Sequence, residues 1–176
     1  MFASEHYDLK PDIVTGGKGL SGGVGSLAAV LLTEEVADSF YGGTTPTSAG
    51  NAVSAAAGKR LLELLEEEGL MENATRAGKQ LTEEVAALED PWVGDIRFLG
   101  LLGGVELVSS KETAEPLSKE MVGKVRDGLF HEGMLITTSG PHGNVLRIQP
   151  PLCISAAQIS LFTAALGRVL AQVRES

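Results

Sequence analysis

The sequence lacks several features that would assign a protein to a class at once. It has one cysteine, Cys153, in 176 residues. This excludes an intramolecular disulfide and fits a reducing compartment, so we expect a cytoplasmic protein. Acidic residues outnumber basic ones: the chain has 23 Asp and Glu but only 14 Lys and Arg, which gives a net charge of −9. Such a surface would not neutralise a row of phosphates, so we expect no nucleic-acid partner.

Long apolar runs and leader segments are also missing. No 18 consecutive residues are apolar, and no basic segment followed by an apolar one stands at the start, so we expect neither a membrane span nor a signal peptide. The composition of 43% hydrophobic and 21% charged residues is that of a globular chain. Cys153 lies in the apolar segment PPLCIS, and we expect it to be a buried packing thiol.

Motifs for metal, phosphate-loop and serine chemistry do not occur either. The histidines His6, His131 and His142 have no metal-ligand spacing among themselves or with carboxylates, so no metal site is expected. The segment GGKGLSGG lacks the spacer and the Ser/Thr of a Walker loop, and there is no G-x-S-x-G elbow.

The first part of the chain has the pattern of an α/β protein. Residues 12–15 and 27–33 are short apolar runs bounded by glycine, which predicts buried strands. Thr33 is then expected to cap a helical turn, and residues 41–51 form a loop by composition.

The rest of the chain alternates helices and strands, with a boundary expected near Asp90–Pro91. Apolar spacing predicts one helix that ends at Gly69 and a second that ends before Asp90. The remainder is predicted to be an α+β unit, with two strands in 95–108, a helix over 117–129, strands at 134–138 and 144–149, and a last helix that begins with a capping box of Ser155 and Gln158.

The most informative segment is PDIVTGGKGL, residues 11–20, because it places Lys18 between glycines after a strand-like run. A primary amine becomes a nucleophile when desolvation or a neighbouring cation favours its neutral form, and flanking glycines let a flat cofactor or a phosphate approach the backbone. The alternative is a solvated loop lysine.

Two further positions have alternatives that the sequence leaves open. Arg147 lies in the strand-like run VLRIQPP, where its guanidinium must either pair with an internal acid or face a pocket. Thr44, Thr45 and Thr47 form a hydroxyl-rich loop before a helix, which suits a phosphate, although simple capping of the helix is the favoured interpretation.

Four segments, in order, resemble motifs of the class III pyridoxal-phosphate-dependent aminotransferases of fold type I. They are SEHYDLKPDIVTGGKGL at 4–20, TSAGNAVSAAAG at 47–58, VGDIRFLGLLGGVELV at 93–108 and GNVLRIQPPL at 143–152. The resemblance runs over essentially the whole chain, and residues 139–155 are most similar to alanine–glyoxylate-type members. A lysine-based binding module unrelated to this cofactor would require the order of the motifs to be coincidental.

The resemblance implies transamination between an amino acid and a 2-oxo acid with pyridoxal 5′-phosphate as cofactor. It places the Schiff-base lysine and the proton-transfer base on Lys18. The hydroxyl that binds the cofactor phosphate across a dimer interface would be that of Thr47, and Arg147 would bind the substrate carboxylate.

The fold that the resemblance implies is α/β, the end of a fold type I large domain followed by an α+β C-terminal small domain. We expect residues 1–50 to form part of the cofactor-binding large domain, with the end of its parallel sheet and the Schiff-base lysine loop. Residues 51–90 would be connecting helices, and residues 91–176 the small domain.

The chain also departs from the family's pattern. Val24 and Ser26 stand where the family has tyrosine and proline, Ala52 replaces the proline of the threonine motif, and Phe98 replaces the glycine after the arginine. Together these changes predict a diverged loop near the cofactor. The family's phosphate turn, ring-stacking aromatic and pyridine-pairing aspartate have no counterpart here, so we expect little transamination by the chain alone and exposed edges on its first strands.

The alternative is a non-catalytic truncated remnant, or one half of a split aminotransferase that acts only with a partner chain. The expected partners are amino-acid and 2-oxo-acid substrates, together with a second copy in a homodimer or a missing N-terminal half.

Overall fold

The computed structural model describes residues 3–40 and 47–176, so Thr44 and Thr45 lie outside the described residues. The chain divides into two compact units, which we call the N-terminal unit (Met1–Gly69) and the C-terminal unit (Leu70–Ser176). This division falls inside the stretch 51–90, for which connecting helices are expected, and the proposed domain boundaries stay a prediction.

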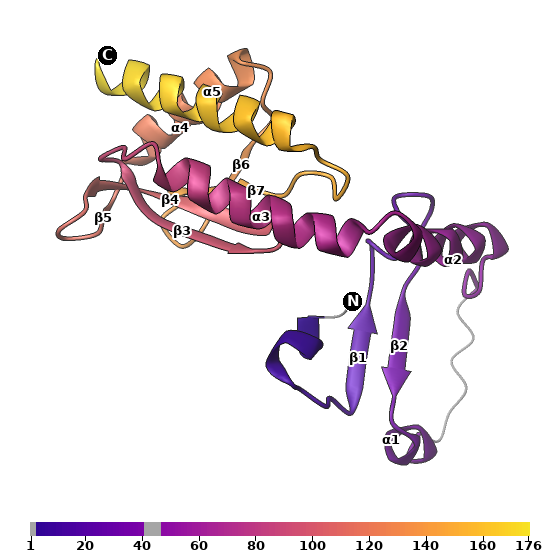
Figure 1. Ribbon diagram of the computed structural model, residues 1–176. Coiled ribbons are helices and arrows are strands. Elements are labelled where there is room, and N and C mark those ends of the chain that lie inside the picture. Colours follow the sequence, from indigo (N-terminus) through magenta and orange to yellow (C-terminus); the bar gives the residue numbers. More distant parts are fainter. Residues whose placement is uncertain (1–2, 41–46) are drawn as a thin grey trace. The chain divides into compact units, whose positions relative to one another are not determined.

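The N-terminal unit contains a two-stranded ribbon. β1 (Ile13–Gly16) pairs antiparallel with β2 (Ala29–Leu32), in register from Ile13 opposite Leu32 to Gly16 opposite Ala29 (Figure 1). The strands lie where the sequence predicted them, but the prediction that they are buried is wrong, since every residue of β2 is exposed. The physical reason is that a two-stranded sheet cannot cover its own faces. Both outer edges are also unpaired among the described residues, as expected.

Three helices accompany this ribbon in sequence: the 3-10 helix η1 (Ala3–Tyr7), the short α1 (Glu34–Asp38) and the long α2 (Ala52–Glu67). Thr33 is at the N-cap position of α1 as expected, but its side chain makes no capping hydrogen bond. Gly69, with a φ of 59°, follows the last turn of α2, as the sequence predicted.

Helix α2 packs closely on the glycine-rich stretch that follows β1. Gly58 is buried, and a Cβ there would lie 2.5 Å from Cδ2 of Leu27 and 3.0 Å from the carbonyl oxygen of Leu20. Gly25, with a φ of +71°, also has no room for a side chain, because a Cβ there would lie 2.5 Å from Oγ of Ser54 on α2. Small residues on α2 therefore allow a close approach, and the loop after β1 packs against the helix.

The C-terminal unit is an antiparallel sheet with three helices. Its strands run in the order β3-β4-β7-β6, and β5 pairs with β4. In chain order the elements are α3 (Leu70–Ala86), β3 (Val93–Leu99), β4 (Leu102–Ser110), β5 (Glu115–Pro116), α4 (Lys119–His131), β6 (Thr137–Ser139), β7 (Val145–Ile148) and α5 (Ala156–Arg174).

One face of this sheet packs against α3, α4 and α5 and forms the core (Figure 1). The alternate strand positions Val105, Leu107, Leu146 and Ile148 all point into this core. Because neighbouring positions of a strand point to opposite faces, Arg97, Glu106 and Arg147 share the other face. The predicted helices and strands of this part are confirmed, and only the short β5 was not expected.

The last helix confirms the capping box that the sequence predicted. Oγ of Ser155 accepts the backbone N–H of Gln158, and the Gln158 side chain accepts the N–H of Ser155, which completes the capping box. Among the described helices, α5 is the one that is long and apolar enough to span a membrane. Its apolar side chains, including Ile159 and Leu166, are buried in the core of the C-terminal unit, which accounts for that composition.

Candidate functional site

Lys18 lies two residues beyond β1, in a turn at the mouth of the glycine-rich loop. The N–H of Leu20 donates to the carbonyl oxygen of Gly17 at 2.8 Å, and this turn carries Lys18. Its side chain is exposed and makes no ion pair or hydrogen bond with any residue that the structure describes. The turn therefore presents a free primary amine at the end of a strand.

The space beside Lys18 is open. A Cβ placed on Gly17 or on Gly19 would meet no atom within 4 Å. A flat molecule can therefore approach the backbone on either side of the lysine. The chemistry and the space both suit a ligand with an aldehyde group.

Thr47 lies in the turn before α2. The structure does not favour the simple capping interpretation for its hydroxyl, because the N-cap is Asn51, whose Oδ1 accepts the N–H groups of Val53 and Ser54 at 3.1 Å each. Thr47 is exposed, and its hydroxyl has no hydrogen bond to another described residue. It is thus available to an external acceptor.

Arg147 lies on β7, opposite Gly104 of β4 and Thr137 of β6. Of the two alternatives that the sequence left open, pairing with an internal acid is not found among the described residues, since no ion pair or hydrogen bond joins the Arg147 side chain to any of them. Arg147 is exposed and lines a groove of about 640 Å³. An exposed guanidinium without a carboxylate partner can bind an anionic ligand.

The groove beside Arg147 is mainly apolar, and Arg147 is the one charged residue among the described residues that line it. Cys153 also lines the groove and is exposed, so the prediction of a buried packing thiol is wrong. The reason is local, because after Pro151 the chain turns away from the sheet and Ile154, not Cys153, packs against the core.

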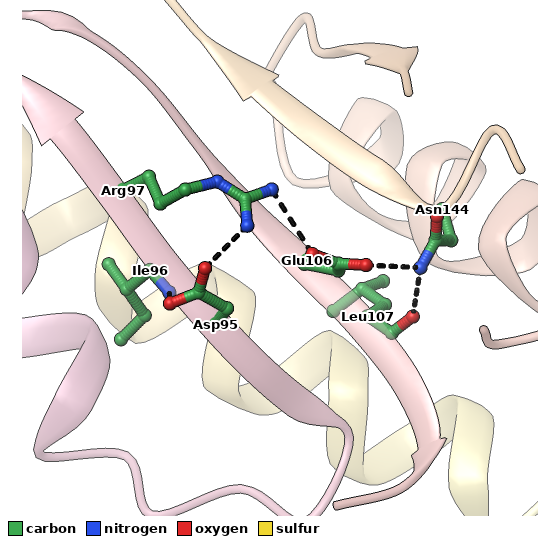
Figure 2. Close-up of polar contacts among 6 residues, drawn as sticks. All are labelled: Asp95, Ile96, Arg97, Glu106, Leu107 and Asn144. Atoms are coloured by element: carbon green, nitrogen blue, oxygen red, sulfur yellow. Dashed lines mark hydrogen bonds and ion pairs between the residues drawn. The ribbon is translucent and has the colours of Figure 1, made fainter. Parts of the chain in front are cut away.

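Figure 2 shows a polar network around Glu106. By the strand register, Arg97 and Glu106 lie on the same face of the sheet as Arg147. Arg97 pairs with Asp95 on its own strand and donates from Nη2 to Oε2 of Glu106 at 3.1 Å. The buried Asn144 donates from Nδ2 to Oε1 of Glu106 at 3.4 Å and to the carbonyl oxygen of Leu107 at 2.7 Å. The hydrogen bond to Glu106 is the main cause that raises the pKa of Arg97 above its ordinary value.

No role for Arg97, Glu106 or Asn144 could be read from the motifs of the sequence. The alternating pattern of DIRF and GVELV could have placed Arg97 and Glu106 on one face, but it does not show which strand lies beside β4. The pairing of β4 with β7 is long-range, and it brings Asn144 to Glu106. No group of three or more metal-ligating side chains occurs in residues 3–40 and 47–176.

Comparisons with known proteins agree on one family. The sequence pattern of the class-III aminotransferases matches residues 1–170. The chain is 36% identical to an alanine/serine racemase of Pyrococcus horikoshii over 156 residues, which is 88% of this chain and 32% of that protein. It is 39% identical to a mitochondrial alanine–glyoxylate aminotransferase 2 homologue of Arabidopsis thaliana over 158 residues, 86% of this chain and 32% of that protein.

Solved structures lead to the same group. An aminotransferase of Bacillus anthracis superposes with a TM-score of 0.89 at 32% identity, over 96% of this chain and 40% of that one. A transaminase from the marine bacterium Virgibacillus gives a TM-score of 0.90 at 28% identity, over 99% of this chain and 42% of that one. The chain thus spans about a third of the length of these curated relatives and about two fifths of these solved chains.

Proposed function

The chain belongs to the class III aminotransferases, and from this premise we propose that it supplies Lys18 and Arg147 to a pyridoxal-phosphate-dependent transamination between an amino acid and a 2-oxo acid. The observation that carries the proposal is the position of Lys18. Its amine is free and exposed in a glycine turn at the end of β1, with open space on both sides.

The residues present fit the reactive end of the cofactor. Lys18 offers the primary amine that a pyridoxal aldehyde requires, and the missing side chains of Gly17 and Gly19 leave room for a flat ring. Thr47 offers an unpaired hydroxyl that suits a phosphate oxygen. When bound, the cofactor supplies an electron-withdrawing ring that stabilises negative charge at the substrate α-carbon.

Each of these residues has a separate task in the proposed reaction. Nζ of Lys18 would hold the cofactor at its aldehyde group and, once an incoming amine has displaced it, would act as the base that takes the proton from the substrate α-carbon and as the acid that gives this proton to the cofactor. Oγ1 of Thr47 would donate a hydrogen bond to a phosphate oxygen of the cofactor held by the other subunit of a dimer. The guanidinium of Arg147 donates two parallel N–H bonds to the substrate carboxylate and so orients its α-carbon.

For the substrates we propose alanine as donor and glyoxylate as acceptor. This choice is supported by the names of several relatives, among them the Arabidopsis thaliana protein at 39% identity and a human alanine–glyoxylate aminotransferase 2 at 33% identity. Other relatives are named a racemase and a diaminobutyrate aminotransferase, so the assay must also follow D-alanine and other amino donors.

A second candidate is that the chain acts only with additional polypeptide, in a homodimer or with a partner that carries the rest of the family's sequence, or that it is a remnant with no activity. The exposed β1–β2 ribbon favours this candidate. Ile13, Val30, Leu31 and Leu32 are between 43% and 60% exposed, and apolar strands of this kind are normally covered in a larger sheet.

The test begins with pyridoxal phosphate and the purified chain. After titration, borohydride reduction and peptide mapping should show one adduct on Lys18 that Lys18→Ala abolishes. The matched control is Lys10→Ala, which removes another exposed lysine of the same unit and should leave the adduct unchanged.

A chain with this adduct is then assayed for the formation of pyruvate and glycine from alanine and glyoxylate. Adducts scattered over several lysines would contradict the assignment of Lys18. An adduct confined to Lys18 without turnover would favour the second candidate.

A further inference from the structure

Arg97 and Arg147 occupy equivalent positions on the two sides of β4. In the sheet register Gly104 lies between them, since it is the partner of Arg97 on β3 and of Arg147 on β7. Glu106 lies two residues further along β4 and points to the same face. The carboxylate of Glu106 is therefore a diagonal neighbour of both arginines, and long side chains reach such neighbours.

Only one of the two arginines pairs with this carboxylate. Oε2 of Glu106 accepts from Nη2 of Arg97 at 3.1 Å, and Oε1 accepts from Nδ2 of Asn144 at 3.4 Å (Figure 2). Both carboxylate oxygens thus have a donor, whereas the Arg147 side chain has no partner among the described residues.

The surroundings explain why Glu106 pairs with the β3 side. Arg97 has a second carboxylate on its own strand, Asp95, which keeps its guanidinium beside β4. Asn144 approaches Glu106 from the β7 side and is itself fixed, because it is 1% exposed and also bonds the carbonyl oxygen of Leu107. Gly104 places no side chain of its own between the arginines, and Cγ1 of Val145 lies over it, 2.7 Å from where a Cβ would be, so Glu106 reaches Arg147 by passing the Val145 side chain.

We propose that Arg97 is a positioning residue that holds the Glu106 carboxylate away from Arg147 and so keeps Arg147 free for the carboxylate of a substrate. The inference rests on the proposed function, in which Arg147 binds that carboxylate. Without Arg97, Glu106 pairs with Arg147 and competes with the ligand inside the same molecule.

The experiment measures how pyruvate binds to the full chain at low ionic strength. The signal is the Nε–Hε resonance of Arg147 in protein labelled with ¹⁵N-arginine, identified by its loss in Arg147→Gln. We expect Arg97→Met to raise the dissociation constant of pyruvate about two- to fivefold, the range that an exposed ion pair can impose. The double variant Arg97→Met/Glu106→Gln should return to the wild-type value.

A second double variant separates direct pairing from a change in net charge. Arg97→Met/Glu106→Asp keeps the negative charge but shortens its reach, so direct pairing predicts recovery and a purely long-range charge effect predicts none. The control Arg126→Met breaks a distant exposed pair with Asp127 and should leave binding unchanged.

The outcomes distinguish this inference from the proposed function. Unchanged pyruvate binding in Arg147→Gln, measured by calorimetry because this variant lacks the Arg147 resonance, would overturn the role of Arg147 itself. Wild-type binding in Arg97→Met, or failure of either double variant to recover, would overturn the role of Arg97 alone. If Arg97→Met does not fold, Glu106→Gln gives the answer. In Glu106→Gln, a dissociation constant of pyruvate within about twofold of the wild-type value supports the inference. A two- to fivefold lower dissociation constant would overturn it, because Glu106 would then already compete with pyruvate for Arg147 in the wild type.

Discussion

Replacing Gly78 by alanine tests how closely helix α3 packs on the turn between β3 and β4. Gly78 lies in the middle of α3, and an added Cβ would lie 2.0 Å from the carbonyl oxygen of Gly100 and 2.7 Å from its carbonyl carbon. The obstacle is backbone in a tight turn, where Gly100 has a φ of +58°. The helix must therefore move away from the turn to accept the methyl group.

Two effects of opposite sign determine the size of the change. Alanine favours a helix over glycine by roughly 1 kcal/mol. Overpacking lowers the free energy of unfolding by roughly 1–3 kcal/mol. Because the obstacle here is the backbone of Gly100 and not a flexible side chain, we expect a cost at or above the upper end of that range. A shift of about 1 Å also loosens the contacts of the buried Ala77, Leu81 and Val85 on the same helix. We expect the free energy of unfolding to fall by about 2 kcal/mol.

The matched control is Gly123→Ala in α4. A Cβ on Gly123 would meet no atom within 4 Å, so only the gain in helix propensity remains, and we expect stabilisation of up to about 1 kcal/mol. Urea unfolding followed by tryptophan fluorescence suits both variants. The sequence has one tryptophan, Trp92, and it packs against the core of the C-terminal unit.

The difference in the free energy of unfolding between Gly78→Ala and Gly123→Ala tests whether α3 packs on the β3–β4 turn. Should Gly78→Ala be as stable as Gly123→Ala, α3 would not lie on the β3–β4 turn at the distance described. A change in the slope of the unfolding curve, rather than in its midpoint, would indicate an altered unfolded or native ensemble and not a local clash.

Three further changes have defined outcomes. The Thr163 hydroxyl donates to Glu84 at 2.6 Å and is the main cause that lowers the pKa of Glu84 below its ordinary 4.5. This stabilisation is present above pH 4.5 and is lost as the pH falls through the lowered pKa, so urea unfolding across a pH series should show a loss on acidification that Glu84→Gln reduces. Arg174→Met removes the 2.7 Å ion pair to the buried Asp90 and should lower the free energy of unfolding, measured by circular dichroism, by roughly 1–3 kcal/mol. Asn51→Ala removes the cap of α2 and should cost about 1 kcal/mol, seen as reduced helix content on mild heating.

The C-terminal unit could be predicted from the sequence because its signals are local. Glycines with positive φ end its helix and turn segments, as at Gly133 with a φ of 81°, and the capping box of Ser155 and Gln158 marks the start of α5. Apolar residues at helical spacing, such as Leu81 and Leu166, are in the core as expected. These features depend on a few neighbouring residues, so a single sequence is sufficient to detect them.

The burial of β1 and β2 could not be predicted in the same way. Short apolar runs bounded by glycine indicate a strand, but whether a strand is buried depends on which other strands lie beside it. Leu31 is 55% exposed although its neighbours in sequence are apolar. The sequence shows the residues of a strand, and it does not show the polypeptide that would cover them.

At the candidate site, the position of an arginine could be predicted from the sequence, but the choice of Glu106 between Arg97 and Arg147 could not. The run VLRIQPP indicates that Arg147 must have either an acid or a pocket as its neighbour, and both alternatives are consistent with the sequence. The choice depends on Arg97, which lies 50 positions earlier, so it follows from the order β3-β4-β7 and not from any motif.

The distribution of buried apolar side chains bears on the chemistry of Lys18. Every buried hydrophobic residue among the described residues lies in the C-terminal unit, whereas the described part of the N-terminal unit, which carries Lys18, has none. A lysine amine becomes a strong nucleophile when its surroundings exclude water or place another cation beside it, and Lys18 is exposed. A borohydride adduct confined to Lys18 would therefore mean that the glycine turn alone directs the cofactor, while adducts shared equally with Lys10 would assign that selectivity to whatever polypeptide covers β1 and β2.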